Sequence, residues 1–177
     1  MSDDIGTAIE RLEQALASRP GFGVGTARAV TTLTAGLRCT TDDGTWQIDA
    51  DLNARLGGGG DAPTPTALLR AALGSCMAMT YRLRAARRGV PLTAVRVVVE
   101  TDSAVAGMLL SDSPEPAGFR AVRYHVEVDS PAPAGDVLAV LDEGDGLSPV
   151  LDALSRPNAV ERTVTITCGA TATAEVA

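Results

Sequence analysis

The stretch that most constrains the fold of this chain is residues 64–89, TPTALLRAALGSCMAMTYRLRAARRG. Thr64 followed by Pro65 is typical of a helix start, because the hydroxyl can accept a backbone N–H and proline lacks the N–H that this position leaves unpaired. Gly89 after a run of arginines is typical of a helix end. From 67 to 81 Arg70 is the only charged residue, so the helix is apolar on nearly all sides. We therefore expect a buried central helix around which the rest of the chain packs.

Cys76 lies near the middle of this helix. From its pattern alone we interpret it as a small buried apolar residue, because free cysteine is among the most buried residue types. The helix dipole gives little support to a thiolate about three turns from the N-terminus, and Arg70 and Arg82 lie on other faces. A reactive thiolate at Cys76 needs a cation from another segment. Spacings of three and four place it on one face with Leu69, Ala72, Leu73, Met79, Thr80 and Leu83.

The segments around the helix contain several strand-like stretches in succession, which favours an α+β fold with antiparallel sheets. A short amphipathic helix is expected at residues 3–18. A second helical region at 136–156 is interrupted at 144–146 and restarts at Ser148-Pro149, again a cap followed by proline. The expected strands are residues 26–41, 45–52, 94–101, 119–129 and 160–176, with a turn at 42–44.

Composition excludes several functions. With 22 acidic against 15 basic residues the chain would be repelled by nucleic acid, and the absence of lysine excludes Schiff-base chemistry and a P-loop lysine. The three cysteines, Cys39, Cys76 and Cys168, are at no spacing typical of disulfides or metal sites, so we expect no metal and no cofactor. The longest apolar run is shorter than the ~20 residues of a membrane span and the N-terminus is acidic, so we expect a cytoplasmic protein without membrane contact.

Three motifs indicate a family. Residues 64–100 resemble the central-helix motif of the OsmC/Ohr family, in which a run similar to P-x-E-L-L-x-A-A-L-G-x-C carries a cysteine. LNARLGGGG, residues 52–60, is similar to the arginine-bearing loop before that helix in OsmC proteins. GLSPVLDALSRP, residues 146–157, is similar to the family's second motif, in which C-P-V precedes a helix. The resemblance covers about residues 25–168 and leaves residues 1–21 as an additional helical arm.

The resemblance implies an OsmC-like domain over residues 22–177, with antiparallel sheets wrapped around long central helices in an intertwined homodimer. It also implies an activity, the thiol-dependent reduction of hydroperoxides in the bacterial oxidative-stress response. By position, Cys76 would be the peroxidatic thiolate and Arg55 the arginine that stabilises it and polarises the peroxide. The family implies sites at the dimer interface.

Two departures from the family pattern leave alternatives open. Ser148 stands where the family has its resolving cysteine, and Thr66 or Ala67 stands where it has a glutamate that orients the arginine. The first hypothesis is a one-cysteine hydroperoxide reductase whose sulfenate is resolved by an external thiol, or by Cys39 or Cys168. The second is a catalytically degenerate dimer that binds a hydrophobic small molecule in the interface cleft. A purely structural dimer is the third.

Overall fold

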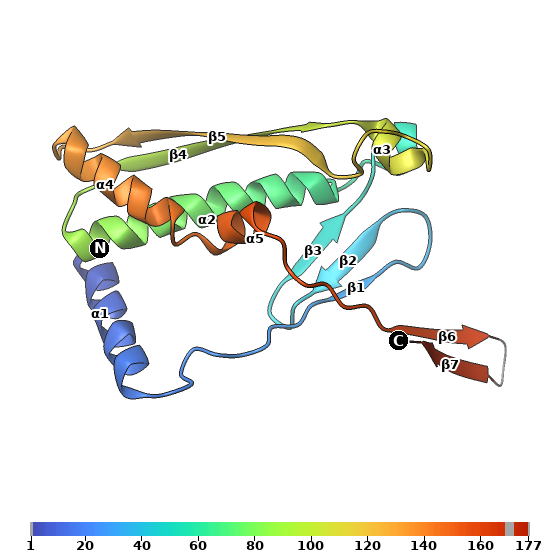
Figure 1. Ribbon diagram of the computed structural model, residues 1–177, viewed down its shortest axis with the longest axis horizontal. Helices are drawn as coiled ribbons and strands as arrows, with labels where there is room; N and C mark the ends of the chain where they lie inside the picture. Colours follow the sequence, from blue (N-terminus) through green and yellow to red (C-terminus); the bar gives the residue numbers. More distant parts are fainter. Residues whose placement is uncertain (1, 169–171, 177) are drawn as a thin grey trace.

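The computed structural model describes residues 2–168 and 172–176, and side chains for residues 5–166. Its central element is α2 (Pro65–Arg88), which contacts α1 (Ser2–Ser18), β4 (Ala94–Ser103), α4 (Ala134–Asp145) and α5 (Pro149–Ser155). Figure 1 shows α2 in green along the centre of the molecule, beside the long β4–β5 hairpin. The predicted α+β class with antiparallel sheets is confirmed.

The predicted limits of the central helix are confirmed. Thr64 caps α2, with its hydroxyl accepting the backbone N–H of Ala67 at 3.2 Å, and Pro65 is the first helical residue. Gly89 ends the helix with φ of 66°, a conformation that favours glycine. Each end therefore follows from a local sequence signal.

The predicted burial of α2 on nearly all sides is wrong for the single chain. The buried face carries Leu73, Met77, Tyr81 and Ala85, each at most 1% exposed. Most of the face predicted from the spacing around Cys76 is open instead, because Leu69, Met79 and Leu83 are 37%, 63% and 40% exposed. One side of α2 packs on the hairpin and the C-terminal helices, and the described residues leave much of the other side exposed.

The sheet before α2 has three short strands in the order β1-β2-β3, all antiparallel. They are β1 (Val30–Thr32), β2 (Cys39–Asp42) and β3 (Gln47–Ala50). The prediction of one long strand over 26–41 is wrong, because the chain turns between β1 and β2 with Gly36 at φ of 64°. The turn predicted at 42–44 is confirmed: the N–H of Gly44 donates to the Asp42 carboxylate at 2.7 Å.

The hairpin after α2 pairs β4 with β5 (Phe119–Asp129), as predicted. Val95 lies opposite Val128 and Val97 opposite Val126, and all four valines pack against the core. The connection contains an unpredicted short helix, α3 (Val105–Leu109). The hairpin thus supplies the apolar surface on which the buried face of α2 rests.

The remaining elements lie at the two ends of the chain. α1 packs near the C-terminal end of α2, where Arg87 pairs with Glu13 at 3.0 Å and with Glu10 at 3.8 Å. The predicted single strand over 160–176 is wrong, since β6 (Val164–Cys168) and β7 (Ala172–Val176) form an antiparallel hairpin. Figure 1 shows this hairpin and the β1–β2–β3 sheet extending away from α2. Among the described helices, none is both long and apolar enough to cross a membrane.

Candidate functional site

Cys76 and Ser148 are brought together by the packing of α5 on α2. The Ser148 hydroxyl donates a hydrogen bond to the Cys76 sulfur, with 3.4 Å between Oγ and Sγ. Ser148 is 1% exposed, whereas Cys76 is partly exposed. Cys76 and Ser148, which lie on two of the family motifs, are therefore in contact, and residue 76 is partly exposed to solvent.

Ser148 has a local reason to lie where it does. It is the N-cap of α5, and its hydroxyl oxygen accepts the backbone N–H of Leu151 at 3.5 Å, with Pro149 at the first helical position. Because the oxygen accepts from the backbone, its own proton is available to the sulfur. The predicted cap at Ser148-Pro149 is confirmed, and the same hydroxyl serves both the helix and the thiol.

A carboxylate anchors the end of α4 just before Ser148. Asp145 accepts the Tyr81 hydroxyl at 2.5 Å and the Tyr124 hydroxyl at 2.9 Å, which ties α4 to α2 and β5. Gly144 allows the close approach, since a Cβ there would lie 2.5 Å from the Tyr81 ring. Burial, followed by the hydrogen bond to Asp145, raises the pKa of Tyr81. This anchor holds the connection to α5 against the helix that carries Cys76.

Sequence reasoning missed this anchor. Residues 144–146 were interpreted only as an interruption of a helix, and Tyr81 lay in an apolar pattern with no marked role. A tyrosine on a buried helix face is a weak signal that could have been followed, because a buried phenol requires a hydrogen-bond partner. The identity of that partner, 64 positions away, is set by tertiary packing.

Arg55 lies on η1 (Ala54–Leu56), in the loop between β3 and α2. Its side chain is exposed, and within the described residues it makes no hydrogen bond or ion pair, with Cys76 or with any other group. The structure of the single chain thus does not join the two residues predicted to share the site. The role of Arg55 stays a prediction.

The loop that carries Arg55 is organised by Asp51, a residue that sequence reasoning did not select. Asp51 is 2% exposed, and its carboxylate accepts the backbone N–H groups of Leu52, Gly59 and Asp61 at 2.7, 3.0 and 3.3 Å. Burial works against the charged carboxylate, but these hydrogen bonds outweigh it and lower the pKa of Asp51. Glycine is required at Gly58, where a Cβ would lie 1.9 Å from the Leu52 carbonyl oxygen.

The other candidate residues lie outside the contact between Cys76 and Ser148. Thr66 is exposed and its hydroxyl bonds that of Thr64 at 3.0 Å, while Ala67 donates its N–H to the same cap. Cys39 is a free thiol on β2, paired in register with Ala50. The side chain of Cys168 lies outside the described part, so resolution of Cys76 by either thiol stays a prediction. Among the described residues, no cluster of histidine, cysteine and carboxylate groups could hold a metal.

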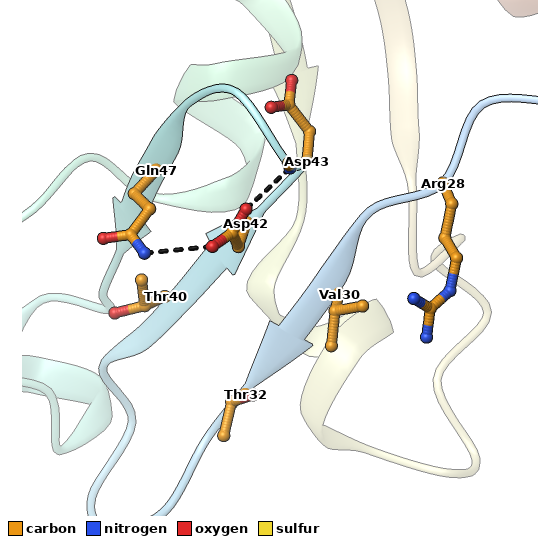
Figure 2. A pocket seen from close by; sticks show the side chains of 8 residues that line it. Arg28, Val30, Thr32, Thr40, Asp42, Asp43 and Gln47 are labelled. Carbon is orange, nitrogen blue, oxygen red and sulfur yellow. Dashed lines mark hydrogen bonds between the residues drawn. The ribbon is translucent and has the colours of Figure 1, made fainter.

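Two hollows near these elements differ in character. One of about 650 Å³, lined mostly by polar residues, lies on the β1–β2–β3 sheet, and Figure 2 shows Asp42 within it accepting a hydrogen bond from Gln47. Its lining includes neither Cys76 nor Arg55. An apolar groove of about 450 Å³ runs along the open side of α2, lined by Ile5, Ala78, Met79, Arg82, Leu83 and Val95. This groove offers an apolar ligand a surface on the central helix.

Comparison with known proteins identifies the family. A family model described as OsmC-like protein matches residues 58–163, more than half of the chain. The chain belongs to the OsmC-like family. The match begins within the glycine loop, at residue 58, and includes α2 with Cys76, the hairpin and α5 with Ser148. No curated protein in the comparison matches the sequence significantly.

Solved structures of the OsmC-like family share this fold. An OsmC-like protein from Mycoplasma pneumoniae superimposes with a TM-score of 0.63 at 17% identity, over 74% of this chain and 88% of that chain. An organic hydroperoxide resistance protein OsmC from Legionella pneumophila has a TM-score of 0.57 at 22% identity, over 75% and 90%. One from Elizabethkingia anophelis has a TM-score of 0.57 at 15% identity, over 75% and 89%. At these identities the likeness shows the fold alone.

Proposed function

We propose that this OsmC-like protein is a thiol-dependent hydroperoxide reductase of the oxidative-stress response, with Cys76 as its peroxidatic thiol. The observation that carries the proposal is that Cys76 is partly exposed and receives a hydrogen bond from Ser148 on the second family motif. The structural neighbours from Legionella pneumophila and Elizabethkingia anophelis bear the name organic hydroperoxide resistance protein, which supports the same chemistry. The proposed substrate is an organic hydroperoxide.

The first step is an attack by the Cys76 thiolate on the terminal oxygen of the hydroperoxide. A sulfur–oxygen bond forms and the oxygen–oxygen bond breaks, so that sulfur loses two electrons and becomes a sulfenic acid. The remainder of the hydroperoxide leaves as an alkoxide and takes up a proton to become an alcohol. Arg55 is the cation proposed to hold the peroxide and the thiolate during this step.

The second step is proposed to use an external thiol, because the Ser148 hydroxyl cannot form a disulfide with the sulfenic acid. One thiol condenses with the sulfenic acid, giving a mixed disulfide and water. A second thiol attacks the mixed disulfide, which returns the Cys76 thiol and releases the disulfide of the two small molecules. Cys39 and Cys168 remain alternative resolving groups within the chain.

We further propose that the protein acts as a homodimer, with the site completed at the interface. The open side of α2 supports this, since Met79 is 63% and Leu83 is 40% exposed. So does the sheet that extends away from the core, on which Ile48 is 48% exposed. Exposed apolar surface of this kind favours association. A stable folded monomer in sedimentation equilibrium would contradict the dimer.

The test of the reductase is consumption of cumene hydroperoxide in the presence of dithiothreitol. Cys76→Ser should abolish it, whereas Cys39→Ser should retain it. Mass spectrometry with a sulfenic-acid trap should place the label on the peptide that contains Cys76. If the unaltered protein consumes no hydroperoxide and Cys76 is not labelled, the proposal fails.

A second candidate function is the binding of a hydrophobic small molecule, and the apolar groove on α2 is the observation that favours it. Its volume, about 450 Å³, is within the range of small-molecule sites, roughly 300–1,000 Å³. A fluorescent fatty-acid analogue should then bind the protein, and Leu83→Glu should weaken binding while Cys76→Ser should not. Absence of binding by the unaltered protein would remove this candidate.

A further inference from the structure

We infer that Ser148 is itself a catalytic residue, whose hydroxyl donates a hydrogen bond to the Cys76 thiolate and stabilises its charge. The inference rests on the proposed function, because it assigns a role within the same site. A position that carries a resolving thiol in the family pattern would here carry an activating donor. Ser148 cannot form the disulfide that a resolving cysteine would form, but its hydroxyl can stabilise the Cys76 thiolate.

The structure holds the Ser148 hydroxyl in position to donate a hydrogen bond to the Cys76 sulfur. Ser148 is 1% exposed and its Oγ lies 3.4 Å from Cys76 Sγ, within hydrogen-bond range for sulfur. The N–H of Leu151 points at the same oxygen, at 3.5 Å, and so directs the hydroxyl proton away from the backbone and toward the sulfur. Because the cap and the proline after it set the position of Ser148, its hydroxyl is preorganised before any peroxide arrives.

The anchor at the end of α4 holds this donor in place. Asp145, three residues before Ser148, accepts hydroxyls from Tyr81 on α2 and Tyr124 on β5. Tyr81 is on the same helix as Cys76, so that the donor and the sulfur are tied to one another through a short chain of contacts. Movement of the end of α4 away from α2 would break these hydrogen bonds, and Ser148 follows that end by three residues.

Charged groups on the neighbouring elements have other partners or are exposed. On α2 itself, Arg70 donates to Thr101 and Arg82 to the Leu92 carbonyl. Arg84 and Arg88 of α2 pair with Glu143 of α4, and Arg87 pairs with Glu13 of α1. On α4 and α5, Asp145 is held by the two tyrosines, Asp136 and Asp142 are exposed, and Asp152 is paired with Arg156. On β4, Arg96 and Asp102 pair with Glu127 and Arg123, and Glu100 is exposed. Within the described residues, Ser148 is the side chain that donates a hydrogen bond to the Cys76 sulfur.

The expected effect follows from the charge on the sulfur. A hydrogen bond to an ionised group is roughly twice as strong as a neutral one, so the hydroxyl favours the thiolate over the thiol. Its loss should slow the reaction of Cys76 with an electrophile near neutral pH by about tenfold. The thiolate that does form is less stabilised and therefore at least as nucleophilic, so the rate at high pH should not fall.

The experiment measures alkylation of Cys76 by iodoacetamide from pH 5 to 11, with the modified peptide quantified by mass spectrometry. In Ser148→Ala the pH midpoint of the alkylation rate should rise by about one unit, with an unchanged or higher rate at the alkaline limit. Ser148→Thr, which keeps the hydroxyl and the cap, should restore the original midpoint. Ser75→Ala is the matched control, since that neighbouring hydroxyl donates to the Ala71 carbonyl at 2.7 Å instead of to the sulfur.

The outcomes separate a catalytic from a structural serine. If Ser148 only caps α5, Ser148→Ala should change the rate by the same factor at every pH, and that result overturns the inference. Ser148→Gly provides a second donor-free variant, because glycine costs a helix cap only a few tenths of a kcal/mol. Alkylation involves no peroxide, so a protein that fails to reduce cumene hydroperoxide but shows the shifted midpoint would contradict the proposed reductase and leave the donor role of Ser148 intact.

Discussion

The hydroxyl of Ser148 lies 3.4 Å from the sulfur of Cys76, although 72 positions separate the two residues. The contact joins two of the three motifs on which the sequence resemblance rests, one on α2 and the other at the start of α5. It also decides between two chemistries for the oxidised thiol. A serine at this distance can donate a hydrogen bond to the sulfur, but it has no sulfur of its own with which to form a disulfide.

The first prediction concerns the disulfide that Ser148 prevents. Ser148→Cys should allow an intramolecular disulfide between Cys76 and the introduced thiol after one equivalent of cumene hydroperoxide, because the two side chains already touch. Mass spectrometry without reduction should show the cross-linked pair of peptides. The unaltered protein should instead give the trapped sulfenic acid at Cys76. A variant that also stops at the sulfenic acid would show that the two sulfurs cannot meet.

The second prediction concerns the buried tyrosine that anchors α4. Tyr81→Phe should lower the free energy of unfolding in urea by roughly 1–2 kcal/mol near pH 8, because Asp145 loses a donor. Tyr124→Phe is the matched control, with a smaller expected loss, since Tyr124 is 37% exposed and Tyr81 only 1%. Equal losses for the two variants would contradict the importance given to burial.

The same tyrosine should make stability depend on alkaline pH. The pKa of Tyr81 is raised in the folded state above its ordinary value of about 10. Its contribution is therefore complete below pH ~10 and is lost as the pH rises through the folded value. The difference in unfolding free energy between the unaltered protein and Tyr81→Phe should narrow above pH ~10. A difference in unfolding free energy that stays constant up to pH ~12 would rule this dependence out.

The third prediction concerns the loop that carries Arg55. Asp51→Asn places an amide where a carboxylate oxygen accepts backbone N–H groups, so the loop over residues 57–60 should open. Trypsin should then cleave after Arg55 faster than in the unaltered protein. Asp61→Asn is a suitable control, because Asp61 is exposed and contributes its backbone N–H, which this change retains.

Asp51 should also contribute to acid stability, with the opposite sign to Tyr81. Its pKa is lowered in the folded state, so its contribution is complete above the unfolded value of about 3.9 and is lost as the pH falls through the folded value. The difference in stability between the unaltered protein and Asp51→Asn should therefore close below pH ~4. Circular dichroism during acid titration measures the stability of both proteins. A stability difference that widens in acid would contradict the prediction.

The fourth prediction tests the role proposed for Arg55. Arg55→Ala should slow sulfenic-acid formation at Cys76 by about tenfold. This factor corresponds to the free energy of one charge-assisted hydrogen bond. Arg28→Ala is the matched control, because Arg28 is also exposed and lines the hollow on the β1–β2–β3 sheet instead. An unchanged rate in Arg55→Ala would remove Arg55 from the site and require another cation.

Features with local causes were predictable from the sequence. The limits of α2 follow from Thr64-Pro65 and Gly89, and the start of α5 follows from Ser148-Pro149, because caps depend on hydrogen bonds within one turn of the chain. The β4–β5 hairpin followed from its valine pattern. The long strand expected over 26–41 failed because a single glycine turn divides it, and strand pattern alone does not mark where pairing stops.

The sequence by itself determined the limits of α2, the start of α5, the α+β class and the three motifs that indicate the OsmC-like family. Tertiary structure alone decided that Cys76 meets Ser148, that Asp145 receives both tyrosines, and that Asp51 organises the loop of Arg55. The physical reason is the range of the interactions. A cap is satisfied by atoms a few residues apart, whereas a buried hydroxyl or carboxylate takes its partner from whichever distant segment packing brings within about 3 Å.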